Sequence, residues 1–246
     1  FLARYYYKIP SENITNIKHI LIPFFAIFIP FLLVMDQPDL GTAVLILVGG
    51  IAVIWLTGFK IKFFFYSFLL MICFLPVGVA FLKPYQKTRI LTFFDPERDA
   101  LGAGYQIIQS KIALGSGGIF GKGFLQGSQS YLDYLPEKHT DFIFTLFSEE
   151  FGFFGSTILL LLYVTIIYRI TAIGRMARNN FAKLYCFSFA AAFFFYVAVN
   201  MSMVLGLLPI VGAPLPIMSY GGSSMLAIMI GLGIVMSCKI YQQEEI

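Results

Sequence analysis

Long apolar stretches, each followed by a short polar segment, repeat along the chain. A helix that crosses a bilayer needs about 20 consecutive apolar residues, and stretches near that length lie at residues 20–35, 42–56, 63–82, 142–168, 184–205 and 219–238. They are continuously apolar, whereas the strands of a membrane β-barrel alternate between apolar and polar residues. The pattern predicts an all-α, polytopic membrane helical bundle with about six transmembrane helices, forming a single integral membrane domain over residues 1–246.

The composition agrees with a membrane protein. Hydrophobic residues make up 59% of the chain and charged residues only 12%, about half the charged fraction of a soluble domain. The three cysteines lie in separate apolar stretches, which favours packing roles over a disulfide framework or a metal site. The net charge of +4 follows from the membrane topology described next, and it requires no nucleic-acid partner.

Lysine and arginine residues gather on alternate connections between the apolar stretches. The basic connections precede the first stretch, separate the second from the third and the fourth from the fifth, and follow the sixth; they contain Arg4, Lys8, Lys18, Lys60, Lys62, Arg169, Arg175, Arg178, Lys183 and Lys239. The connections at residues 36–41 and 206–218 contain neither residue type. By the positive-inside rule the basic connections are cytoplasmic, so we expect the large loop at residues 83–140 to lie outside.

The chain opens on Phe1, without an initiator methionine or the charged start of a signal peptide. Residues 1–7 are typical of the end of a helix that begins upstream. We therefore expect the chain to be the C-terminal part of a longer protein, without its first membrane spans.

The 83–140 loop is long enough that we expect it to be ordered and functional. Residues 106–114 predict a short amphipathic helix on the membrane surface, ended by the glycine-rich segment 115–118. Patterns resembling a calcium loop at residues 95–106 and a phosphate loop at 117–122 both lack required residues, so we assign neither function. The residues of the helix expected at the membrane surface are Ile107, Ile108, Lys111, Ile112 and Leu114.

Basic residues accompany apolar ones throughout this loop: Lys83, Lys87, Arg89, Lys111, Lys122 and Lys138. Such pairing suits an amphiphile with an anionic head, such as a lipid phosphate or diphosphate. The alternative is ordinary snorkelling of lysine and arginine to the membrane interface. Spacing alone leaves both interpretations open.

Ionisable residues crowd the point where the loop enters the fourth apolar stretch, at residues 137–141. If Asp141 lies in the first turn of a helix, then at about 100° per residue Thr145, Ser148 and Glu149 share its side, forming a polar strip. A polar strip in a membrane helix is expected to face a cavity. Asp141 could then accept a proton from a substrate hydroxyl or hold a divalent cation. The alternative is a plain acid that stabilises a helix N-terminus.

The last two apolar stretches carry further polar features. Asn200 lies within the fifth stretch and needs a hydrogen-bond partner there. Residues 206–216 are too rich in glycine and proline to form a continuous helix, and residues 219–224 form a turn rich in donors. Irregular backbone at membrane depth is tolerated only against protein or a water-filled cavity. We therefore place both segments beside the same outer cavity as Asp141.

Taken together, these motifs resemble the SEDS family (shape, elongation, division and sporulation) over nearly the whole chain. The segments at residues 115–118 and 211–216 are more similar to its elongation members than to its division members. The motifs that carry the resemblance lie at residues 37–42, 95–96, 102–106, 109–113, 115–118, 135–144, 149–150, 214–216 and 219–223.

The resemblance implies a peptidoglycan glycosyltransferase of the bacterial cytoplasmic (inner) membrane. Such proteins polymerise lipid II into glycan strands on the periplasmic side, for cell-wall elongation and rod shape. Implied partners are a class B penicillin-binding protein, which crosslinks the strands, and other membrane proteins of the elongation complex. Mg²⁺ or Mn²⁺ could take part, and no organic cofactor is implied.

The family's key loop aspartate falls on Asp141, which the resemblance makes a general base or a metal ligand in a single-step, inverting transfer. Basic residues would neutralise the departing diphosphate, and our candidates are Arg89, Lys111 and Lys138. Further residues expected to contact the substrate are Glu137, His139, Thr140, Ser219 and Tyr220.

One departure from the family pattern concerns a Gln-Pro-Ser-Glu motif followed by a lysine, which the family carries in an earlier span. Residues 9–12 are superficially similar, but they lie on the cytoplasmic side in our topology, so Glu12 takes no role in the site. Two other functions stay open: a flippase or transporter for lipid II, and a non-catalytic scaffold that activates a class B penicillin-binding protein.

Overall fold

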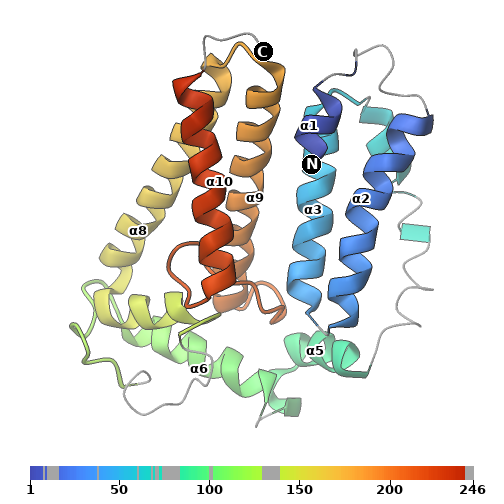
Figure 1. Ribbon diagram of the computed structural model, residues 1–246. Coiled ribbons are helices and arrows are strands. Elements are labelled where there is room, and N and C mark those ends of the chain that lie inside the picture. The colour runs from blue at the N-terminus through green and yellow to red at the C-terminus, as the bar shows by residue number, and fades with distance from the viewer. Residues whose placement is uncertain are drawn as a thin grey trace.

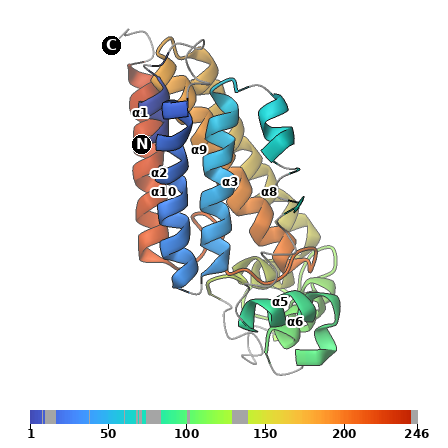
Figure 2. The same cartoon turned by 90° about the vertical axis from the view of Figure 1, so that its right-hand side faces the viewer.

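The computed structural model describes residues 1–7, 9, 17–37, 39–59, 61–67, 69, 72–73, 84–99, 102–128 and 139–241. Long helices run side by side through the molecule (Figures 1 and 2). Their order in space follows from their packing, with α2 against α3, α3 against α9, and α9 against both α8 and α10. The long helices are α2 (Ile17–Asp36), α3 (Leu40–Leu56), α8 (Ile143–Met176), α9 (Asn180–Val204) and α10 (Gly222–Ile240).

Four of the described helices are long and apolar enough to cross a membrane, over His19–Asp36, Ile143–Met176, Asn180–Val204 and Gly222–Ile240. The shorter α3 is also apolar and stands among them (Figure 1). Five of the six predicted stretches therefore coincide with these helices, and the all-α membrane bundle is confirmed. The predicted stretch at residues 63–82 lies largely outside the described residues.

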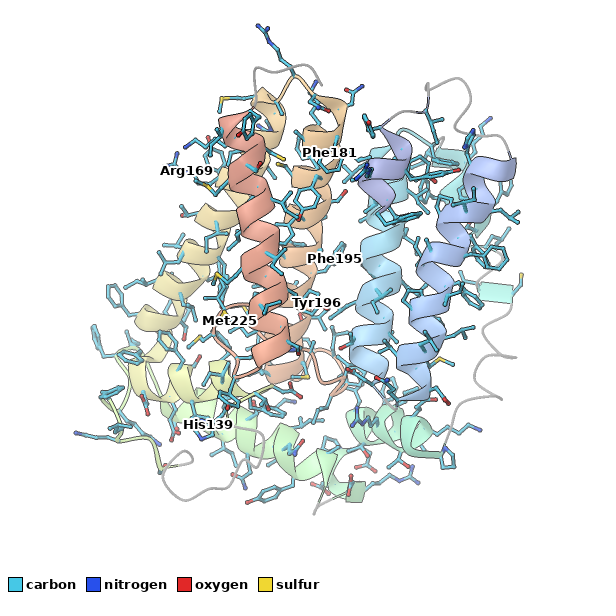
Figure 3. The ribbon with its side chains drawn as sticks, in the orientation of Figure 1. His139, Arg169, Phe181, Phe195, Tyr196 and Met225 are labelled. Atoms are coloured by element: carbon cyan, nitrogen blue, oxygen red, sulfur yellow. The ribbon has the colours of Figure 1, made fainter. Side chains whose placement is uncertain are left out.

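Smaller helices lie across one end of the bundle (Figures 1 and 2): α5 (Pro84–Phe94), the 3-10 helix η2 (Pro96–Asp99) and α6 (Ala103–Ser116). Figure 3 shows Arg169 at the end of the bundle opposite to His139. The basic connection between α8 and α9 is thus separated from the 83–140 loop by the length of the helices, as the charge pattern predicts. Which end faces the periplasm stays a prediction.

Helix α6 confirms the amphipathic helix predicted at residues 106–114, and it ends at Ser116, within the glycine-rich segment. Its buried side is Gly104, Ile107, Ser110 and Ala113, and it packs against α8. Ile108 and Ile112 are exposed. The prediction that Ile107 faces the membrane with Ile108 and Ile112 was wrong, because Ile107 lies on the buried side of α6, which also packs against α8.

Helix α8 is broken at Gly152, whose φ of 66° and ψ of −164° are not helical. The segment before Gly152 lies across the end of the bundle, and the segment after it rises through the bundle (Figure 1). The prediction of a single continuous span over residues 142–168 was therefore wrong. The break places the start of α8 beside α6 and the C-terminal end of α9.

Candidate functional site

A cavity of about 580 Å³ lies where the N-terminal ends of α3 and α10 and the middle of α9 meet two irregular segments. Tyr196 on α9 lies at this cavity (Figure 3). One part of the lining is polar and contains Asp39, Thr42, Thr140, Asp141, Ser223 and Ser224. The remaining wall is mainly apolar and contains Phe189, Ala192, Phe193, Ala227 and Ile228. This division suits a ligand with a polar head and a hydrocarbon chain.

Asp141 lies in a turn at residues 139–142, because helix α8 begins only at Ile143, with Phe142 as its N-cap. Its placement in the first helical turn was therefore wrong. The carboxylate is half-buried and lines the cavity. Its Oδ2 lies 3.5 Å from the position that a Cβ would take at Gly212, whose φ is +78°. Glycine at 212 allows the loop to adopt this conformation beside the carboxylate.

The backbone of this turn is held by a buried amide. Asn200 on α9 is fully buried, and its Nδ2 donates to the carbonyl oxygen of Asp141 at 2.8 Å and to that of Ala213 at 2.7 Å. The amide therefore joins the turn that carries Asp141 to the irregular loop at residues 206–221. This is the partner that the sequence required for Asn200.

Further hydrogen bonds join the same two segments. Ser219 Oγ donates to the carbonyl oxygen of Thr140 at 2.6 Å and accepts from the amide of Leu215 at 2.7 Å. The amide of Tyr220 donates to the carbonyl oxygen of His139 at 2.9 Å. Tyr163 on α8 donates to the carbonyl oxygen of Pro216 at 2.7 Å. These groups of the irregular backbone are thus satisfied by protein, as membrane burial requires.

Asp39 is the charged residue of this cavity that sequence reasoning did not place in the site. Its Oδ1 accepts from the amide of Thr42 at 3.0 Å and caps the start of α3. It lies about 100 residues from Asp141 in the sequence, yet both carboxylates line one cavity. The available signal was the polar 37–42 motif on the same side of the membrane as residues 206–218.

The same pair of aspartates is the natural place to test for a divalent cation. Within the described part of the chain, no group of three or more His, Cys, Asp or Glu side chains could hold a metal ion together. Mg²⁺ commonly takes only one or two carboxylates and completes its coordination with water and substrate phosphate. Asp39 and Asp141, with the neighbouring hydroxyls, fit that kind of site and do not fit a closed protein cage.

Two of the basic candidates, Arg89 and Lys111, contact the loop at residues 206–212. Arg89 on α5 donates from Nη1 to the carbonyl oxygen of Ile210 at 3.3 Å. Lys111 on α6 lies against Gly206, with its Nζ 2.8 Å from the position of a Cβ there. Neither residue lines the cavity. Their contacts therefore support the loop that passes Asp141, and their roles toward a diphosphate stay predictions.

The other candidates fall into three groups. Thr140 and Tyr220 line the cavity with Asp141, and Ser219 donates to the carbonyl oxygen of Thr140. His139 lies in a neighbouring groove that also contains Met225, at the lower end of α10 (Figure 3). Tyr220 lines both the cavity and the groove. Glu137 and Lys138 lie outside the described residues.

The predicted polar strip on α8 does not face the cavity. Thr145 Oγ1 lies 3.0 Å from Ser110 Oγ of α6, Ser148 Oγ accepts from Ser156 Oγ at 2.9 Å, and Glu149 Oε1 lies 2.7 Å from Lys122 Nζ. The outer loop covers this face of the helix. The strip is therefore a packing surface for the loop, and Asp141 is separate from it.

Comparisons with known proteins agree with the sequence motifs. The model of the FtsW, RodA and SpoVE family, described as "Cell cycle protein", matches residues 1–244. The chain is 46% identical over 235 residues to the protein named peptidoglycan glycosyltransferase MrdB of Escherichia coli (strain K12), covering 95% of this chain and 62% of the relative. It is 36% identical over 244 residues to stage V sporulation protein E of Bacillus subtilis (strain 168), covering 99% of this chain and 66% of the relative.

Solved structures show the same fold. One, described as a peptidoglycan synthase complex in which polymerization and crosslinking are coordinated, matches with a TM-score of 0.80 and 33% identity, over 99% of this chain and 67% of that chain. The rod shape determining protein RodA of Thermus thermophilus matches with a TM-score of 0.65 and 25% identity, over 99% of this chain and 62% of that chain. The chain spans about three fifths of the length of the E. coli relative. On this evidence the chain belongs to the FtsW, RodA and SpoVE family, which is the SEDS family that its motifs predicted.

Proposed function

We propose that this chain is part of a peptidoglycan glycosyltransferase that polymerises lipid II for cell-wall elongation. The observation that carries the proposal is the half-buried Asp141 carboxylate in a cavity with one polar and one apolar side. The polar side suits a sugar diphosphate, and the apolar wall suits the first part of a polyprenyl chain. The E. coli relative is itself named a peptidoglycan glycosyltransferase.

In the proposed reaction a sugar 4-hydroxyl of the acceptor attacks the anomeric carbon of the donor. The new carbon–oxygen bond forms as the bond to the diphosphate breaks, and the diphosphate leaves with the electron pair. Asp141 receives the proton of the attacking hydroxyl as general base. One displacement inverts the anomeric centre, whereas retaining enzymes need a second carboxylate as nucleophile.

Bound Mg²⁺ or Mn²⁺ would supply positive charge that stabilises the leaving diphosphate. Asp39 and Asp141 are the residues that would hold it, together with the phosphate oxygens of the substrate. Asn200 and Ser219 keep the Asp141 turn in place through their bonds to its carbonyl groups. In this arrangement the chain orients one carboxylate and binds an amphiphile beside it.

We also place the large loop on the periplasmic side of the cytoplasmic membrane and a class B penicillin-binding protein beside the chain. The charge pattern supports the first proposal. A structural neighbour that is a complex for polymerization and crosslinking supports the second. Other elongation-complex proteins are proposed partners on the family resemblance alone.

The test uses the full-length protein with its penicillin-binding partner, lipid II as substrate, and glycan length as the measurement. We expect Asp141→Asn to lower polymer formation by about 100-fold or more, the usual contribution of a general base, with partner binding intact. Asp95→Asn is the matched control, because Asp95 is an exposed aspartate of the same outer loop, paired with Arg98. Unchanged polymer in Asp141→Asn would favour a transporter or a scaffold, and a vesicle assay of lipid translocation would separate those two.

A further inference from the structure

The glycine-rich loop at residues 117–125 supplies hydrogen-bond partners for the backbone groups of α8 on either side of its break. In a continuous helix the carbonyl groups of Glu149 and Glu150 would accept from the amides of Phe153 and Phe154. Here they accept instead from the amides of Lys122 and Gly123, both at 3.0 Å. The amides of Phe153 and Phe154 donate to the carbonyl groups of Gly118 and Ile119, at 2.9 and 3.0 Å.

Two glycines make this close contact possible. Gly121 and Gly152 have φ values of +80° and +66°. A Cβ at Gly121 would collide with the carbonyl oxygen of Glu150, and a Cβ at Gly152 would collide with the amide nitrogen of Gly121. The loop and the broken helix are therefore one backbone unit, in which the bonds lost at the break are replaced.

The charged side chain of this loop points toward a buried carboxylate of α8. Lys122 is the single charged residue between positions 117 and 128, and its Nζ donates to Glu149 Oε1 at 2.7 Å and to Ser128 Oγ at 2.8 Å. Ser128 Oγ also donates to the same carboxylate oxygen at 3.2 Å. The outward side of the loop is consequently uncharged.

That outward side is apolar and continues onto α8. Phe120 is 81% exposed and Phe153 is 71% exposed. The rings of Phe124 and Phe151 lie 6.3 Å apart and join the loop to the helix. We call this surface the aromatic patch; it comprises Ile119, Phe120, Phe124, Leu125, Phe151, Phe153 and Phe154. Beyond it the exposed side of the same helix carries Ile158, Leu161 and Leu162.

We infer that the aromatic patch is inserted into the membrane leaflet at this end of the bundle, so that residues 118–125 lie among lipids. The patch is continuous with the lipid-exposed side of a membrane-spanning helix. The backbone groups named above are paired, which insertion into hydrocarbon requires. Aromatic side chains are also enriched at the membrane–water interface.

Insertion would also set the depth of Asp141. The segment of α8 between the patch and Asp141 is a short helix, and Asp141 lies two residues before it. A patch held in the leaflet would keep that carboxylate near the interface. The inference itself rests on packing and charge and does not depend on the proposed reaction.

The test places one tryptophan at the patch. Trp55 is the single tryptophan of the chain, so Trp55→Phe supplies the background for Phe120→Trp. Leu161→Trp on α8 is the lipid-exposed reference, and Arg98→Trp in the charged η2 turn is the aqueous reference. Fluorescence is measured on the full chain in phosphatidylcholine vesicles, with brominated acyl chains as the lipid quencher and acrylamide as the aqueous quencher.

We expect Phe120→Trp to be quenched by brominated lipid to an extent similar to Leu161→Trp, and by acrylamide about threefold less than Arg98→Trp. Acrylamide quenching equal to that of Arg98→Trp would overturn the inference. Shielding from both quenchers would also overturn it, because a protein surface would then cover the patch. Phe124→Trp repeats the measurement at a second patch position if Phe120→Trp lowers the thermal stability of the protein.

Discussion

At the residue scale, the position of the Asp141 carboxylate depends on groups that never touch the cavity. Asn200 is fully buried, and its Nδ2 donates to two carbonyl oxygens of irregular backbone. A buried carbonyl that loses its donor costs about 1–3 kcal/mol. In the proposed reaction Asn200 would therefore be a positioning residue, which acts through the backbone of Asp141 and Ala213.

We predict that Asn200→Ala lowers kcat for polymerisation by about tenfold or more while KM for lipid II changes little, because misplacing a reacting group affects the transition state most. Hydrogen exchange of the amides in residues 139–142 and 212–216 should become faster. Ser110→Ala is the matched control, since Ser110 is equally buried and bonds the carbonyl group of Val204 and the hydroxyl of Thr145.

The control variant should lose stability without faster exchange in those two segments. If Asn200→Ala and Ser110→Ala gave the same exchange pattern and the same kcat, Asn200 would have only a structural role. The exchange measurement needs no substrate, so it is informative even if the chain proves not to be a polymerase.

At the element scale, the break in α8 decides the geometry of the end of the bundle that carries α5 and α6. A straight helix of 34 residues would be about 51 Å long, well beyond the roughly 30 Å hydrocarbon core of a bilayer. Gly152 divides it into a segment across the bundle end and a segment that rises through the bundle (Figure 1). The glycine-rich loop can satisfy the break only because Gly121 and Gly152 approach each other directly.

We predict that Gly152→Ala and Gly121→Ala each destabilise the protein by about 1–3 kcal/mol, through strain at positive φ and a collision with backbone. Because the two positions share one contact, the double variant should cost clearly less than the sum of the single variants. Thermal or denaturant unfolding in detergent measures all three.

Gly233→Ala in α10 is the control, since no atom outside the neighbouring backbone of its own helix lies within 4 Å of its Cβ position. It should be neutral or slightly stabilising, as for alanine in an ordinary helix. Additive losses in the double variant would contradict the shared contact between loop and helix.

At the scale of the whole molecule, the helices separate a basic end from an end that carries the cavity. Arg169 and His139 mark these two ends (Figure 3). The cavity opens among three helices and two loops, so no single segment contains the site. Both observations suit a protein that takes its substrate from one leaflet of a membrane and acts on one side.

We predict opposite accessibility for two engineered cysteines in a variant that lacks Cys73, Cys186 and Cys238. Glu97→Cys, in the charged η2 turn, should react with a membrane-impermeant maleimide in intact cells. Arg178→Cys, between α8 and α9, should react only after the membrane is permeabilised, because the positive-inside rule places it in the cytoplasm. Labelling of Arg178→Cys alone in intact cells would reverse the topology.

Much of the architecture could be predicted because it depends on local composition. Continuous apolar stretches predicted five helices that the structure shows, and the helix at residues 106–114 was visible in its spacing. The break at Gly152 was not visible in the sequence, because the backbone bonds that replace those lost at the break come from the glycine-rich loop, about 30 residues earlier in the chain. Asp39 was missed as a cavity residue because its neighbours in space come from distant segments.

The sequence by itself determined that this is an all-α membrane protein of the SEDS family, and it singled out Asp141. The length of an apolar stretch and the presence of a family motif are properties of short segments, so they can be recognised without knowledge of the packing. Only the tertiary structure decided that Asp141 precedes its helix, that Asp39 shares its cavity, and that Thr145, Ser148 and Glu149 face the loop instead. Those outcomes depend on which segments meet, and hydrogen bonds between distant residues such as Asn200 and Ala213 are what bring them together.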